Sequence, residues 1–284
     1  MNALPFPTNP AVGTRFQNWV WNGSRWVCSP GGMVVITQVF RSNATYIPSL
    51  GLVTAVAATV GGGGAGGAAG PSANALQILG GGGGGSGGHS RVTLPAALVL
   101  GGVAVVIGLG GVPTDTDVQG PNGGVTSFGA FCVANGGTGG WFNSGVAGTH
   151  WGEAGLGGSP GVGDLTFPGA DGTAGPFLNL TAAQQNTYAG GHGGQVLGGA
   201  RNYSWGPGQI PGGQASWANT GAGGSGAMCN QLATGAISQG GAGGSGICWV
   251  DEYCWVAPGS EGCCPDGETG QARIAWPGWR GDDC

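Results

Sequence analysis

Apolar positions in the first sixty residues are mainly aromatic and β-branched, in short segments separated by polar turns. Residues 19–27 read WVWNGSRWV, in which an Asn-Gly pair separates two such flanks. This dipeptide is the strongest short-range hairpin signal, because both central residues of a type I′ turn need positive φ. We therefore predict a β-hairpin that gathers Trp19, Trp21 and Trp26 on one face. An isolated hairpin could not keep that face dry, so the face needs a partner.

The chain continues with β-like segments as far as residue 60. MVVITQVF at 33–40 and LGLVTAVAATV at 50–60 are rich in valine, isoleucine and threonine, with a polar turn at 41–43 between them. An uncharged stretch at 94–112 is long enough to span a bilayer. Its proline, glycines and valines favour a buried strand followed by a glycine helix over a transmembrane helix, so we expect no membrane span.

From residue 61 to 246 the pattern changes to glycine runs separated by short apolar or aromatic segments. The longest run of glycine is 80–85, and GAGGSG occurs at 221–226 and again at 241–246. No Gly-X-Y period is present, which excludes collagen. Extended helices with three residues per turn have no internal hydrogen bonds, so parallel neighbours can bond to one another where glycine lets their backbones approach.

These patterns predict an all-β fold with a glycine-rich bundle of polyglycine-II-type helices. Run 80–85 would lie inside the bundle, and the mixed run 154–161 at its edge. We expect three regions along the chain. They are an N-terminal β-hairpin module at 1–32, β-strands with the glycine-rich helix bundle at 33–228, and a loop-rich, cysteine-containing C-terminal region at 229–284.

Composition argues against disorder and excludes several functions. The 284 residues include 70 glycines and 17 prolines, but only 7% are charged and 40% are hydrophobic, whereas disordered chains are usually rich in charge. The net charge is −5, lysine is absent and the arginines are scattered. The chain therefore lacks the basic footprint of nucleic-acid binding and the lysine of a P-loop. No secretory signal is predicted, since the first residues contain neither a basic nor an apolar segment.

Motifs for nucleophilic catalysis occur only by coincidence of glycine. Residues 84–88 and 157–161 match G-x-S-x-G, but neither is followed by the helix pattern that a nucleophile elbow needs. His150 and Glu153 are spaced to share a proton on a helix, and the glycine-rich context makes a helix there unfavourable. We predict a protein that is not an enzyme and uses no cofactor.

Histidines and acidic pairs give no stronger indication of a metal site. His89 and His192 each lie among glycines and are interpreted as solvated turn residues. Two carboxylate pairs offer oxygen ligands for a cation, although such pairs more often form a solvated face; they are Asp115/Asp117 and Asp251/Glu252.

Most of the cysteines lie near the end of the chain. They lack the paired C-x-x-C spacing of zinc ribbons, so a disulfide-stapled terminal region is the preferred interpretation. Free thiols and a metal site are the alternatives. The disulfide candidates are Cys229, Cys248, Cys254, Cys263, Cys264 and Cys284.

Aromatic residues outside the hairpin cluster in predicted loops. Aromatic rings displayed on a rigid scaffold suit recognition of sugars or of a protein, because they give a large contact area at low entropic cost. The alternative is packing between subunits, which is slightly favoured for Trp141 and Trp217. Candidate receptor-binding residues are His150, Trp151, Tyr203, Trp205, Trp276 and Trp279.

Four sequence motifs carry a family resemblance. They are PFPTNPAVGTRF with WVWNGSRWV near the N-terminus, LGLVTAVAATVGGGGAGG, NGGVTSFGAFCVANGGTGG at 122–140 and GGAGGSGICWVDEYCW at 240–255. Together they resemble the glycine-rich tail-fibre and receptor-binding proteins of tailed bacteriophages, over residues 5–255. The cysteine-rich tail departs from the family pattern.

The resemblance implies an oligomeric, commonly trimeric, virion component of the phage tail, made in the host cytoplasm. Its implied partners are other tail proteins, further copies of itself and a bacterial surface receptor. Trp19, Trp21 and Trp26 would dock on the virion or on a neighbouring subunit. The alternatives are a capsid or neck decoration protein and a glycine-rich structural protein of the cell surface.

Overall fold

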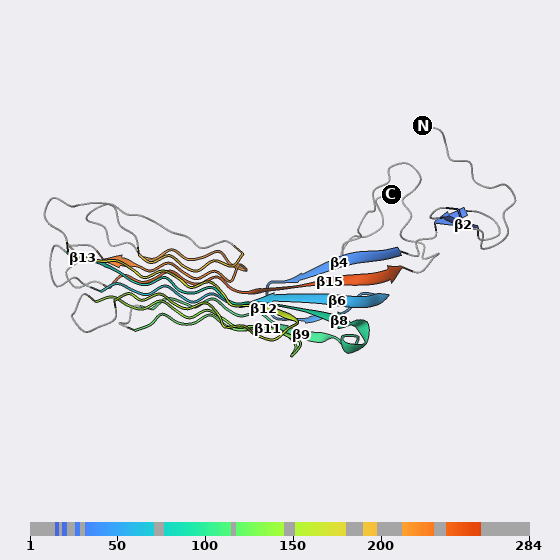
Figure 1. The fold of residues 1–284 in the computed structure, drawn as a ribbon, viewed down its shortest axis with the longest axis horizontal. Coiled ribbons are helices and arrows are strands. Elements are labelled where there is room, and N and C mark those ends of the chain that lie inside the picture. The colour runs from blue at the N-terminus through green and yellow to red at the C-terminus, as the bar shows by residue number, and fades with distance from the viewer. Residues whose placement is uncertain are drawn as a thin grey trace, which may run out of the picture. The chain divides into compact units, whose positions relative to one another are not determined.

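The computed structural model describes residues 15–16, 19–21, 26–28, 32–70, 77–114, 118–144, 151–179, 190–197, 212–229 and 237–256. Its regular elements are β-strands, apart from one 3-10 turn, η1 (Ala96–Leu98). The predicted all-β class is confirmed for these ranges, which contain no α-helix (Figure 1).

The N-terminal strands form the predicted hairpin with one strand added. β1 (Arg15–Phe16), β2 (Trp19–Trp21) and β3 (Trp26–Cys28) make an antiparallel sheet in that order. The register places Trp21 opposite Trp26, as a two-flank hairpin requires. Whether the three tryptophan rings share a face stays a prediction, since only the backbone of these strands is described.

A five-stranded sheet has the order β12-β8-β6-β15-β4. The strands are β12 (Leu165–Phe167), β8 (His89–Pro95), β6 (Leu52–Val60), β15 (Ile247–Val256) and β4 (Gly32–Phe40). β6 and β8 pair antiparallel from Thr54↔Pro95 to Val60↔His89. Burial alternates along β8, whereas the second half of β6 is buried throughout, so both faces of the sheet are covered there.

A second, four-stranded antiparallel sheet has the order β11-β10-β9-β5. Its strands are β11 (Cys132–Ala134), β10 (Thr126–Phe128), β9 (Val103–Val106) and β5 (Ala44–Tyr46). The Ser90 hydroxyl donates to the carbonyl of Val133 at 2.6 Å, and Thr59 Oγ1 lies 3.4 Å from Cys132 Sγ. These contacts join the second sheet to β8 and β6.

The stretch at 94–112 contains a strand, as predicted, with alternate residues buried, and a helix formed by its glycines stays a prediction. It includes the end of β8, η1, β9 and an extended segment from residue 107. Among the described residues, no helix has both the length and the apolar character needed to cross a membrane.

Glycine runs extend from these sheets to a third sheet, β13-β7-β14. It consists of β13 (Phe177–Asn179), β7 (Gln77–Gly80) and β14 (Met228–Cys229), paired antiparallel. Figure 1 shows the runs as extended, wavy traces that lie alongside one another. They are neither α-helix nor strand, so their backbone groups need partners in other runs.

Run 80–88 shows where those partners are. Its successive N–H groups donate in turn to three other runs, and every third residue returns to the same run. The amides of Gly82, Gly85 and Gly88 thus donate to the carbonyls of Trp141, Thr138 and Asn135, at 2.8–2.9 Å. The amides between them donate to runs 170–176 and 221–227, and carbonyls of run 80–88 accept from runs 61–67, 155–158 and 191–194.

Run 61–70 has the same period. The amides of residues 61–67 and 69 donate in rotation to runs 82–88, 121–124 and 238–244, and the amide of Gly70 donates to Asn143. The two copies of GAGGSG are also direct neighbours, because the amides of Gly241 and Gly244 donate to the carbonyls of Ser225 and Ala222, at 2.8 Å each. The repeated hexapeptide therefore occupies two adjacent positions in one hydrogen-bonded block.

Close backbone approach explains the glycine content of the interior. A Cβ added at Gly84 would overlap the carbonyl oxygens of Gly64 and Ala65. Run 80–88 is buried throughout, whereas Leu156, Ser159 and Pro160 are exposed. The expected interior position of run 80–85 and the edge position of run 154–161 are confirmed.

The chain forms two compact units. The first comprises Met1–Val35, Ser49–Val53 and Tyr253–Cys284, and the second comprises Ile36–Pro48 and Thr54–Glu252. Within the first unit, the amide of Trp255 donates to the carbonyl of Gly51 at 2.7 Å, and Gly51 has the positive φ of +80° that favours glycine. The glycine runs belong to the second unit.

Candidate functional site

One end of the glycine runs brings together the bases of four loops. We call it the loop end, and it is defined by β7, β13, β14 and the bridges Ala69↔Ser238, Ala69↔Asn143 and Asn143↔Trp151. The segments between these bases, which are predicted to be loops, lie outside the described residues, and described residues at or next to the ends of each segment pair here. The loops are 71–76, 145–150, 180–189 and 230–236.

Asn143 ties several of these bases together. Its side-chain amide donates to the carbonyl of Gly80 at 3.1 Å, and its backbone bonds to Ala68 and Gly70. The residue is buried, as befits an amide whose hydrogen bonds are made. Beside it, small and apolar side chains form a core cluster of Ala69, Leu79, Ala227 and Cys229. The loop bases are therefore fixed by packing as well as by backbone pairing.

Exposed aromatic and polar side chains lie at the loop end or on the runs that lead to it. Trp151, at one loop base, has 58% of its surface exposed. Glu153 and His192 are also exposed. The carbonyl of Glu153 accepts from the amide of Trp141, and that of His192 accepts from the amide of Thr173. These side chains offer a ring, a carboxylate and an imidazole on a rigid frame. They do not form a buried, converging set of the kind that catalysis uses.

Trp151 is the one candidate receptor-binding residue within the described part of the chain, and the structure places it at the loop end. The other candidates lie outside the described residues, so their role stays a prediction; they are His150, Tyr203, Trp205, Trp276 and Trp279. The virion-docking candidates Trp19, Trp21 and Trp26 lie on β2 and β3.

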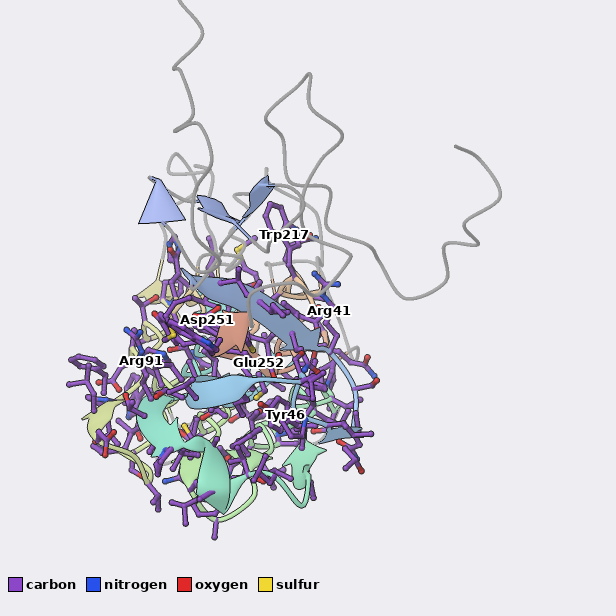
Figure 2. The ribbon with its side chains drawn as sticks, turned by 90° about the vertical axis from the view of Figure 1, so that its right-hand side faces the viewer. Arg41, Tyr46, Arg91, Trp217, Asp251 and Glu252 are labelled. Carbon is purple, nitrogen blue, oxygen red and sulfur yellow. The ribbon has the colours of Figure 1, made fainter. Side chains whose placement is uncertain are left out.

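Trp217 is not brought together with Trp151. Its carbonyl accepts from the Thr220 hydroxyl at 2.7 Å and lies against Gly244. Run 238–246 places Gly244 beside Gly63, near β6, whereas Ser238 bridges Ala69 at the loop end. Trp217, 57% exposed and labelled in Figure 2, thus lies at the other end of the runs. Trp141, by contrast, is half-buried within a run.

Four cysteines of the described residues are buried; they are Cys132, Cys229, Cys248 and Cys254. Burial, and secondarily the neighbouring Cys132, raises the pKa of the Cys248 thiol to about 12. Burial likewise raises the pKa of Cys132. A thiol of this kind is a poor nucleophile, because the thiolate is the reactive form. Cys263, Cys264 and Cys284 lie outside the described residues, so the terminal disulfides stay a prediction.

Asp251 and Glu252 do not converge on a shared cation. Asp251 accepts a hydrogen bond from the Thr37 hydroxyl at 2.6 Å, in exposed surroundings. Glu252, fully buried, accepts one from the Tyr46 hydroxyl at 2.6 Å (Figure 2). Adjacent residues on a strand point to opposite faces, which separates the two carboxylates. No group of three or more potential metal ligands occurs among the described residues, and Asp115 and Asp117 lie outside them.

The buried pair of Tyr46 and Glu252 is a feature that sequence reasoning missed. Alternate residues of β15 are buried; they are Cys248, Val250, Glu252 and Cys254. Glu252 is thus the charged member of a buried row that is otherwise apolar. This period-two pattern was the available signal. The Tyr46 ring packs edge-on against Phe128 with centroids 5.2 Å apart, which holds the hydroxyl in place.

The interpretation of His89 as a solvated turn residue is wrong. His89 begins β8, and its ring stacks between Phe167 and Trp249, with centroids 6.1 and 5.9 Å away. Burial lowers the pKa of His89, and the nearby Arg91 lowers it further. The glycines before His89 suggested a turn, but the strand that follows and its neighbours across the sheet determine its surroundings.

Fold and site together define a class of all-β protein in which glycine runs, joined by backbone hydrogen bonds, carry loops at one end. A family model described as a glycine-rich domain matches residues 39–253, from the end of β4 into β15. The chain belongs to this glycine-rich domain family. A comparison with curated proteins finds no match.

Proposed function

We propose that this protein is a structural virion component, a bacteriophage tail fibre or tail-tip protein that takes part in host attachment. The observation that carries the proposal is the loop end, where four loop bases are held on a hydrogen-bonded block. Binding residues are often placed on loops that a rigid scaffold positions. The resemblance of the sequence motifs to phage tail-fibre proteins supplies the biological setting.

We infer that the glycine runs are polyglycine-II-type helices packed as a bundle. The three-residue period of donors in runs 61–70 and 80–88 supports this inference, since such a helix has three residues per turn. Ordering a residue's backbone costs about 1–2 kcal/mol, so a stable bundle needs nearly every buried amide to be bonded. Backbone NMR chemical shifts should indicate φ of about −75° and ψ of about +145° for these glycines.

The proposal gives each region a role without catalysis or a cofactor. The N-terminal hairpin, with Trp19, Trp21 and Trp26, docks on other tail proteins or on a neighbouring copy. The loops, with Trp151 at one base, face the bacterial surface receptor. The chain is made in the host cytoplasm and resides in the phage tail as a homo-oligomer, for which the resemblance implies a trimer.

Immunogold electron microscopy of a lysate from the source culture tests the proposal directly. Antibody against this chain should place gold at tail tips or fibres, and tail-tip labelling would direct attention to the loops. Gold on capsids or necks would instead indicate a decoration protein. Gold confined to cell envelopes would overturn the viral assignment in favour of a cell-surface structural protein.

A further inference from the structure

Among the strands that the structure describes, β4 is the outer strand of the five-stranded sheet and pairs with β15 alone. The Thr37 hydroxyl on β4 donates to Asp251 of β15, so the edge of β4 that faces β15 is occupied by that strand. Gly32–Phe40 reads GMVVITQVF and contains neither a charge nor a proline. Natural proteins usually protect an outer strand with such residues or with a bulge, because its free edge can template pairing with another chain.

Both faces of β4 are also uncovered over residues 33–37, whereas Gln38 and Phe40 beyond them are partly buried. Residues 33–37 are exposed without interruption, and Met33, Val34 and Val35 have 50%, 40% and 55% of their surfaces exposed. Successive residues of a strand point to opposite faces, so neither face carries a packing layer. β8 in the same sheet shows the ordinary alternation of buried and exposed residues. An uncharged apolar strand in this state is an aggregation hazard unless another strand covers it.

The β4 sequence is complementary to itself. In an antiparallel pair centred on Ile36, Val35 lies opposite Thr37, and the flanking positions bring Met33 opposite Val39. β-Branched and apolar cross-strand pairs of this kind stabilise sheets. β4 itself carries no charge, so no like charges meet across the pair, although the whole chain carries a net charge of −5. Arg41, just beyond the strand, would lie opposite a glycine in this register.

We propose that β4 pairs antiparallel with β4 of a second copy of this chain, with Ile36 at the twofold axis. The five-stranded sheet then continues from one copy into the other. The free edges of the two copies hydrogen-bond to each other in a closed, isologous dimer. A second copy fits better than a charged partner, because the strand offers no charge for such a partner to complement. The pairing goes beyond the proposed virion role, and it predicts a dimer in place of the trimer that the resemblance implies.

Sedimentation velocity of the full chain over a range of concentrations tests the pairing. The wild type should form a dimer. Ile36→Arg should halve the mass, because it sets two like charges opposite each other at the axis. The matched control, Leu98→Arg, changes an exposed leucine on η1 and should leave the dimer intact. A monomeric wild type, a trimer, or a dimer that survives Ile36→Arg would overturn the proposal.

Cysteine cross-linking tests the register and remains decisive if Ile36→Arg fails to fold. Ile36→Cys places two thiols directly opposite each other, at the Cα separation that disulfides span. Mild oxidation should therefore cross-link Ile36→Cys dimers well beyond the wild-type background. Val39→Cys is the matched control, because position 39 meets Met33 rather than itself. Equal cross-linking of the two variants, or none of Ile36→Cys above background, would contradict the twofold register.

Discussion

Gly84 shows what a single residue contributes to this fold. It lies inside the run with neighbours on every side, and its missing Cβ is the space that the carbonyls of Gly64 and Ala65 occupy. Gly101, near η1, has no atom within 4 Å of an added Cβ. The same residue type is thus required in one place by close backbone approach and has room for a side chain in the other.

Gly84→Ala should destabilise the protein by about 1–3 kcal/mol, because the surrounding backbone must shift to admit the methyl group. Gly101→Ala should leave stability unchanged or raise it by up to about 1 kcal/mol, because it restricts the unfolded chain. Urea denaturation of both variants beside the wild type measures the difference. Equal denaturation midpoints for the two variants would show that the close approach at Gly84 is unimportant.

The buried hydrogen bond between Tyr46 and Glu252 is a second residue-scale feature. Tyr46→Phe keeps the ring contact with Phe128 and removes only the hydroxyl donor to a buried carboxylate. We expect a loss of about 1–3 kcal/mol in the free energy of unfolding. Tyr253→Phe is the control, because Tyr253 is next to Glu252 on β15 and only half-buried, and it should cost less. A reversed order would argue against the pair as a stabilising contact.

His89 gives stability a dependence on pH. Because its pKa in the fold lies below the ordinary 6.5, the unfolded chain binds the proton more readily. The contribution of His89 is therefore complete above about pH 6.5 and declines as the pH falls from there toward the lower, folded pKa. Thermal melting of the wild type and of His89→Phe should show the wild type losing more stability between about pH 7 and pH 5. Parallel curves would contradict this assignment.

At the scale of elements, the sequence predicts strands better than their partners. The segments 33–40 and 50–60 correspond to β4 and β6 within two residues, and the two strands that flank the Asn-Gly pair are antiparallel partners. Local β-propensity and turn chemistry are sufficient for these. Neither indicates that β6 lies between β8 and β15, because that order arises from contacts between residues far apart in sequence.

The N-terminal hairpin provides an element-scale prediction. Under the proposed function, deletion of residues 5–28 should leave the glycine runs folded, because the runs belong to the second compact unit. The truncated chain should no longer join virus particles. Circular dichroism checks the fold, and purified particles probed with antibody check incorporation. Particles that still contain the truncated chain would show that the hairpin is not the attachment element.

At the scale of the whole molecule, the glycine pattern predicts a packed block and identifies its interior run, but not the neighbours of each run. Runs without side chains carry almost no information about which run they should meet. The strands and loops at their ends must supply it, as β7 does for run 80–88. The candidate site was predictable only in part for the same reason. Trp151 stands out in the sequence, whereas the gathering of four loop bases follows from the arrangement of the runs.

The three-residue period of the hydrogen bonds constrains how this protein can change length. Inserting one residue into run 80–88 would turn the rest of the run by about 120°, so that each amide beyond the insertion faces the wrong neighbour. Inserting three would restore every direction and only slide the run by one turn. The lengths of the runs should therefore differ between related sequences in steps of three residues. The loops that they carry can vary by any number.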